Sequence, residues 1–129
     1  MLAFMAILGA ASAAAATPSV RPKLPADVAW ASATADDDRF WIRADDVRSQ
    51  YYPASVTVWL HGEHGYNHHV AYKTSLQQIR FFCNGTLQLV ALATTDGDGR
   101  TSKWRGGGSV DKISSGTVYQ KIEREFCAR

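Results

Sequence analysis

The segment SVTVWL, residues 55–60, has the clearest strand pattern in this 129-residue chain. Its apolar residues at even positions fall on one face of an extended chain, whereas Thr57 and Trp59 fall on the other. This alternation predicts a strand with one face on the core. Two interpretations of Trp59 stay open: it lies at an interface with a partner or a second copy, or it packs beneath a proline-rich N-terminal segment.

Downstream, a set of apolar residues at odd positions from 79 to 91 keeps one phase on both sides of Asn84-Gly85. Asn-Gly is typical of a two-residue hairpin turn. Such a turn would move Leu87 and Leu89 away from the face of Phe81. A single long strand with Gly85 as a bulge keeps the pattern whole, and we therefore predict the long strand. The residues that share the phase are Ile79, Phe81, Cys83, Leu87, Leu89 and Ala91.

The last element is predicted to be a helix over residues 117–127. Thr117 with Gln120 fits a capping box. Apolar side chains then recur at the four-residue spacing of a helical face, and these are Val118, Ile122 and Phe126. Shorter strands are expected at 39–43 and 101–104. The fold class that follows is α+β, an antiparallel sheet of five to six strands with a C-terminal helix.

The N-terminal residues indicate export. Residues 1–16 contain a short apolar stretch followed by small residues with cleavage sites of the A-x-A kind near Ala14 to Ala16, as in a signal peptide, although no Lys or Arg precedes the apolar stretch. Residues 17–29 are rich in proline and are predicted to form an extended leader. Residues 30–129 then form one domain. We expect the protein to be exported, and to be periplasmic or secreted.

Cys83 and Cys127 are the two cysteines of the chain. Two cysteines in an exported protein most often pair, because the compartment beyond the inner membrane is oxidising. A Cys83–Cys127 bridge would tie the C-terminal helix to the strand that carries Cys83. Closing a loop of this length is worth about 4 kcal/mol in the chain-entropy model, which matters for a small core.

Composition narrows the range of partners. The 14 Lys and Arg nearly balance the 12 Asp and Glu, and the basic residues are scattered, so neither nucleic acid nor an anionic membrane is predicted as a partner. No apolar stretch after the predicted signal peptide approaches membrane-spanning length. A protein partner or a homodimer is compatible with this composition.

Four histidines, His61, His64, His68 and His69, fall within nine residues. If the loop closes a hairpin, imidazoles from its two ends could bind one Zn, Cu or Ni ion. The alternative is an exposed polar loop in which His is frequent, and we favour it because no H-E-x-x-H motif is present. No cofactor is therefore predicted, and the metal site stays an alternative.

No catalytic group is predicted. Ser55, Ser75 and Ser109 lack the sequence context of an activated nucleophile, and all the histidines lie in one loop. The run Asp36–Asp38 is interpreted as a solvated charge cluster. We therefore expect a protein that is not an enzyme.

Over roughly residues 30 to 128, the chain resembles the surface-adhesin protein E family of exported bacterial proteins. The matching pieces are Trp30, the aromatic strand ending at Asp45-Asp46, VTVW at 56–59, a strand running into Cys83, a DG turn near residue 97, and ISSGTVYQKIEREFC from Ile113 to Cys127. Ser115 stands where the family commonly has Pro, and no Cys follows the signal peptide to carry a lipid anchor. The resemblance implies an antiparallel sheet with a C-terminal helix, no enzymatic activity, and an adhesin-like binding role.

Overall fold

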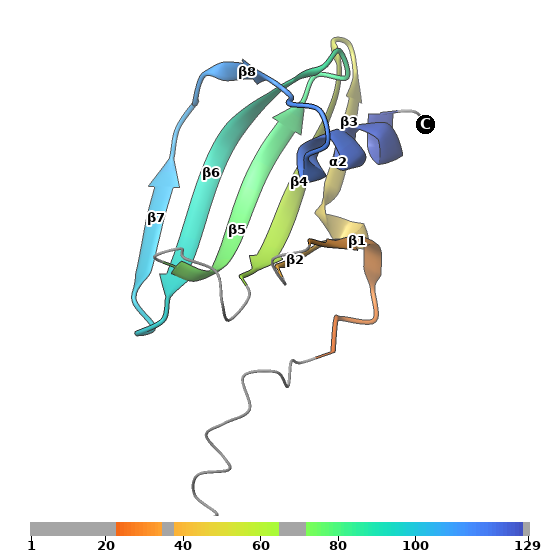
Figure 1. Ribbon diagram of the computed structural model, residues 1–129. Helices are drawn as coiled ribbons and strands as arrows, with labels where there is room; N and C mark the ends of the chain where they lie inside the picture. The colour runs from red at the N-terminus through yellow and green to blue at the C-terminus, as the bar shows by residue number, and fades with distance from the viewer. Residues whose placement is uncertain (1–22, 35–37, 65–71, 128–129) are drawn as a thin grey trace, which may run out of the picture.

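The structure, a computed structural model, describes residues 23–34, 38–64 and 72–127. These residues form one antiparallel sheet with one helix against it (Figure 1). The strands are β1 Val28–Ala33, β2 Arg39–Arg43, β3 Val47–Tyr51, β4 Ala54–Glu63, β5 Tyr72–Phe81, β6 Thr86–Asp96, β7 Thr101–Arg105 and β8 Val110–Lys112, and the helix is α2, Val118–Cys127. The predicted fold class is confirmed.

Strand β4 contains SVTVWL and has the predicted alternation. Its apolar residues are buried on one face of the sheet, with Val56 at 4% exposure and Val58 and Leu60 at 0%. We call this the helix face, because Ile122 and Phe126 of α2 join the same buried cluster. We call the opposite face, to which Thr57 and Trp59 point, the open face; no element within the described ranges lies over it.

The sheet is six strands wide, in the order β1-β2-β4-β5-β6-β7, but contains eight strands. Both extra strands arise because one edge of a long strand is shared by two short ones. β2 pairs with the last residues of β4 and β3 with its first residues, with a 3-10 helix, Ala44–Asp46, between them. β7 and β8 share β6 in the same way. The predicted count of five to six therefore matches the width, and the split edges account for the rest.

The chain reverses direction between β5 and β6, and the prediction of one long strand from 76 to 91 is wrong. The amide of Phe82 donates to the carbonyl of Thr86 at 3.1 Å, which leaves a three-residue loop. Cys83 and Gly85 in this loop have positive φ angles of 60° and 88°. The side chain of Asn84 accepts hydrogen bonds from the amide and the hydroxyl of Thr86 at 3.1 and 2.6 Å.

This loop nevertheless keeps the odd-numbered apolar residues on both sides of Asn84-Gly85 on one face, as the sequence pattern requires. Phe81 pairs with Leu87, and Ile79 pairs with Leu89, so these side chains share the helix face. A loop of three residues, unlike one of two, keeps the odd positions of both strands on one face. The phase changes further on, because a bulge lies opposite Gln78 and Ile79, and Ala91 then pairs with Gln78. The expectation that Ala91 continues the face of Leu89 is wrong for this reason.

Helix α2 begins as its sequence predicts. The hydroxyl of Thr117 accepts a hydrogen bond from the amide of Gln120 at 3.3 Å, and the Gln120 side chain reaches back to the amide of Gly116 at 3.0 Å. The apolar stripe of the helix is buried, with Ile122 at 0% and Phe126 at 7% exposure. No helix among the described residues is long and apolar enough to cross a membrane.

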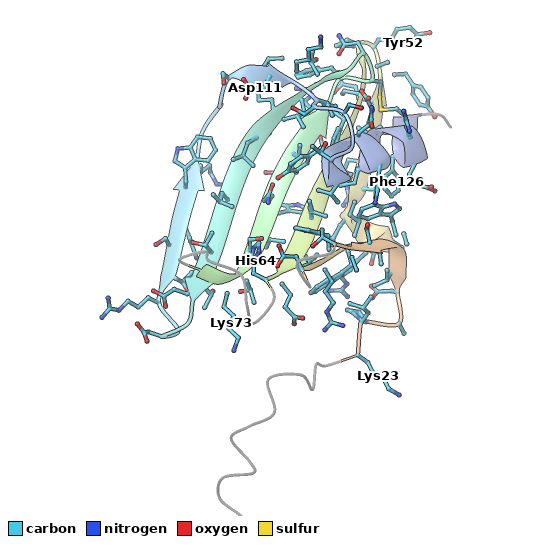
Figure 2. The ribbon with its side chains drawn as sticks, in the orientation of Figure 1. Lys23, Tyr52, His64, Lys73, Asp111 and Phe126 are labelled. Atoms are coloured by element: carbon cyan, nitrogen blue, oxygen red, sulfur yellow. A yellow bond between two sulfur atoms is a disulfide. The ribbon has the colours of Figure 1, made fainter. Side chains whose placement is uncertain are left out.

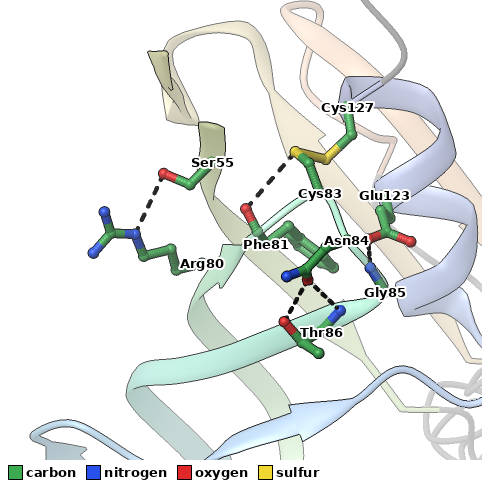
Figure 3. The surroundings of a disulfide bond; sticks show 9 residues. All are labelled: Ser55, Arg80, Phe81, Cys83, Asn84, Gly85, Thr86, Glu123 and Cys127. Carbon is green, nitrogen blue, oxygen red and sulfur yellow. Dashed lines mark hydrogen bonds between the residues drawn. A yellow bond between two sulfur atoms is a disulfide. The ribbon is translucent and has the colours of Figure 1, made fainter. Parts of the chain in front are cut away.

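The predicted disulfide between Cys83 and Cys127 is confirmed (Figure 3). It joins the hairpin loop between β5 and β6 to the last residue of α2, with the two Cα atoms 5.4 Å apart. Glu123, one helical turn earlier, accepts a hydrogen bond from the amide of Gly85 at 2.8 Å. The helix is therefore fixed to this loop by one covalent and one polar contact.

Candidate functional site

Of the four histidines in the predicted cluster, the structure describes His61 and His64, and it places them on opposite faces of the sheet. His61 lies on the open face, where its ring stacks on Trp41 with the centroids 5.4 Å apart and its Nε2 lies 3.1 Å from Asp46. His64 lies at the end of β4 (Figure 2), where its amide continues the pairing with β5 by donating to the carbonyl of Lys73. His61 and His64 are three positions apart along an extended chain, so their side chains point to opposite faces.

This separation means that His61 and His64 do not form one metal site together in this structure. His68 and His69 lie outside the described residues, and nothing follows from the structure about their positions. Within the described part of the chain, no three His, Cys, Asp or Glu side chains come close enough to hold an ion. A site that uses His61 and His64 together would require one of these side chains to cross the sheet.

His64 is part of a buried polar cluster that the sequence analysis missed. Its Nδ1 lies 3.5 Å from an oxygen of Asp38, and its Nε2 lies 3.5 Å from the hydroxyl of Ser75. Asp38 is 7% exposed and Ser75 is 6% exposed. The ring of Phe40 meets the imidazole edge-on, with the centroids 6.2 Å apart. Asp38 is thus buried, and its interpretation as part of a solvated charge run is wrong.

The order of carboxylate, imidazole and hydroxyl in this cluster is the order found in hydrolytic triads. Two observations separate it from a working triad. Both of the separations that involve His64 are 3.5 Å, longer than the reach of about 2.6–3.2 Å over which a base activates a nucleophile. The hydroxyl of Ser75 is also shielded from a substrate by its burial. In this conformation the cluster closes one end of the sheet rather than presenting a nucleophile.

The open face carries polar and aromatic side chains in place of a covering layer. Over β2 and β4 their charges are balanced: the guanidinium of Arg39 bonds the carboxylate of Glu63 at 2.8 Å and lies 5.8 Å from the ring centre of Trp41. His61 has its carboxylate partner in Asp46. This half of the face therefore satisfies its own charged groups.

The other half of the open face contains a groove of about 320 Å³ that lies across β5, β6 and β7. Trp59 of β4 and Leu76 of β5 form one wall. Lys103 and Arg105 of β7 form the other. The residues that line the groove on the open face are Trp59, Leu76, Ala91, Ala93, Lys103 and Arg105.

The bulge in β6 shapes the floor of this groove. Because the bulge changes the phase of β6, Ala91 pairs with Gln78 and Arg105 and so faces the open side, as does Ala93. Both floor residues are small, whereas Trp59 and the β7 cations beside them are long. Without the bulge, Leu92 would occupy the phase that Ala91 and Ala93 now have, and its larger side chain would fill the groove.

Two further hollows lie on the helix side of the molecule. One of about 300 Å³ has an apolar floor that includes Leu87 and Leu89, and Tyr119 of α2 borders it. The hydroxyl of Tyr119 donates to the side chain of Gln77 at 3.0 Å at this border. The other, of about 410 Å³, lies between β3 and the disulfide and includes Phe126 in its lining.

The chain was compared with protein-family models, with curated proteins and with solved structures, and it matched none of them. The resemblance to the surface-adhesin protein E family therefore stays a hypothesis that rests on the sequence alone.

Proposed function

We propose that this chain is an exported, non-enzymatic binding protein of the bacterial envelope, adhesin-like in character, whose partner is a protein. The observation that carries the proposal is the unequal use of the two faces of the sheet. On the helix face α2 covers the apolar core, whereas the open face has no covering element among the described residues and presents aromatic and cationic side chains around a groove. Surfaces of this composition, with aromatic residues and Arg, are typical of protein interfaces.

Export is supported by two independent features. The first, seen in the sequence, is the signal-peptide pattern of residues 1–16. The second, seen in the structure, is the Cys83–Cys127 bridge, because disulfides persist in oxidising compartments. The bridge also leaves no free thiol among the cysteines, so it removes one class of nucleophile.

Fractionation of the cells that make the protein tests the location. We expect the protein in the periplasmic or released fraction, beginning near residue 17, with Cys83 and Cys127 linked in a peptide map.

The same protein with an epitope tag, cross-linked in intact cells, should retain a specific protein partner. Recovery in the cytoplasm with two free thiols would contradict export, and turnover of a small molecule that is abolished by Ser75→Ala would contradict a non-enzymatic role.

The alternative function is periplasmic metal binding by the His61–His69 loop. Because His61 and His64 face opposite sides of the sheet, we expect calorimetry with Zn, Cu and Ni to give the same weak heats for the wild type and for His61→Ala/His68→Ala/His69→Ala. This triple variant keeps His64, whose burial would make its loss a folding defect. One-to-one binding that only the wild type shows would instead support the metal-binding function.

A further inference from the structure

We propose that the groove on the open face binds an extended acidic segment of the partner protein, in which acidic and apolar residues alternate. The proposal rests on the proposed function, since it assigns the partner's binding site and chemistry. Its basis is the juxtaposition of two cations on one wall, an indole on the other and a floor of two alanines. An extended chain laid in the groove would direct alternate side chains to the two walls.

The cationic wall is the first reason for an acidic ligand. Lys103 and Arg105 are both exposed, and neither has a carboxylate of the described residues within ion-pair distance. Asp96 ends β6 just before the turn into β7, and its carboxylate accepts the amides of Asp98 and Arg100 at 2.9 Å each. The charges of this wall are therefore available to a ligand, unlike the paired charges over β2 and β4.

The spacing of the two cations is the second reason. Lys103 and Arg105 are two residues apart on β7, so their side chains leave the same face roughly 7 Å apart. Alternate side chains of an extended ligand have the same spacing. Two acidic residues separated by one apolar residue therefore match the two cations, while the apolar residue meets Trp59 and Leu76.

A second copy of the chain fits this site poorly. β7 is the last strand in the sheet order, and an antiparallel pairing of two β7 edges centred on residue 103 would bring Lys103 of one copy opposite Lys103 of the other. Lysine on an edge strand is also a common means of deterring such pairing. That role requires only exposed charge, and it does not explain the groove with an aromatic wall beside the strand.

A titration of the ¹⁵N-labelled, disulfide-bonded protein tests the proposal. The probe is the synthetic peptide Gly-Asp-Leu-Asp-Leu-Asp-Gly, and its control has Asn at each Asp. We expect peptide-dependent shifts at the amides of Ala91 and Ala93 and at the indole N–H of Trp59. Lys103→Glu/Arg105→Glu should weaken binding at least tenfold, whereas Lys121→Glu/Arg124→Glu, with the same charge change on the exposed side of α2, should stay within twofold. Ala93→Leu, which fills the groove and keeps the charges, should also weaken binding.

Several outcomes would overturn the proposal. The proposal is wrong if no shifts appear at millimolar peptide, or if the two charge-reversal variants lose affinity equally. It is also wrong if the shifts gather at Leu87 and Leu89 instead of the groove. Tenfold tighter binding of polygalacturonate would make the ligand a polysaccharide and not an acidic peptide. The proposed function fails separately. If the cross-linked partner is retained equally by wild type and by Lys103→Glu/Arg105→Glu, the groove assignment is wrong while the binding function stands; if the wild type retains no partner, the function itself is wrong.

Discussion

Gly62 lies on the helix face of β4, where Ser75 and Phe40 approach its backbone closely. A Cβ on this residue would lie 2.6 Å from the hydroxyl oxygen of Ser75 and 3.1 Å from the ring of Phe40. The absence of a side chain therefore lets both of these residues sit over β4, where Ser75 reaches His64 and Phe40 covers the imidazole. One glycine supports the packing of the whole polar cluster.

We expect Gly62→Ala to lower the free energy of unfolding by about 1–3 kcal/mol, as overpacking of a buried site does. The matched control is Gly97→Ala, because a Cβ there meets nothing within 4 Å and Gly97 has no positive φ. Urea unfolding of the two variants measures the difference. Adding Ser75→Ala to Gly62→Ala should recover part of the loss, and identical midpoints for Gly62→Ala and Gly97→Ala would show that the site is not tightly packed.

The polar cluster also shows why part of the candidate site escaped prediction. Asp38, His64 and Ser75 come from three different segments, and they meet only because Gly62 pairs with both Phe40 and Ser75 across neighbouring strands. Such a meeting depends on the register of two strand pairs. The sequence marks each strand by its alternation but does not mark which residue of one strand faces which residue of the next.

At the scale of elements, α2 depends on the sheet for its existence. A helix of ten residues is too short to be stable alone in water. Its buried anchors are Ile122 and Phe126, and its C-terminal end is held by the disulfide. Because the bridge and the Glu123–Gly85 hydrogen bond act on the same loop, the hairpin between β5 and β6 works as the docking point for the helix.

We therefore expect Cys83→Ser/Cys127→Ser to destabilise the protein by about 4 kcal/mol, because the bridge closes a loop with a sequence separation of 44 residues. Hydrogen exchange of the folded variant should accelerate in α2 much more than in β4. The control is the wild type under reducing conditions, which should show the same pattern. Equal acceleration in helix and sheet would mean that the bridge stabilises the sheet as a whole and does not specifically hold α2.

The elements differ in how far their sequences predict them. β4 and α2 follow from periodicity, since each has one fully apolar face. β3 and β8 do not, because nearly all of their residues are exposed and they carry no apolar alternation. They exist as strands because β4 and β6 offer unpaired edges. The hairpin at Asn84-Gly85 is hard to predict for another reason: the phase of Leu87 and Leu89 excludes a two-residue turn, whereas a three-residue loop satisfies both the turn signal and the phase.

For the whole molecule, the width of the sheet, the fold class and the core can be predicted from the long strands. The short edge strands cannot, because they form only by pairing with the long ones. The same edges distinguish the two sides of the molecule. β2 and β4 form the side where Arg39, His61 and Glu63 of the open face have charged partners, and β7 forms the side where Lys103 and Arg105 have none among the described residues. The groove lies at the second side, and the position of its alanine floor depends on the bulge in β6, which the sequence does not mark.

The disulfide has a consequence for how the protein withstands proteolysis. Cys83 and Cys127 enclose β6, β7, β8 and α2 in one covalent ring. The exposed turn between β6 and β7 lies inside this ring, and exposed turns with glycine are preferred sites of proteolytic cutting. A single cut there opens the ring without releasing a fragment, because the new ends still belong to chains that the bridge joins. The cut molecule keeps both walls of its groove on one covalent body.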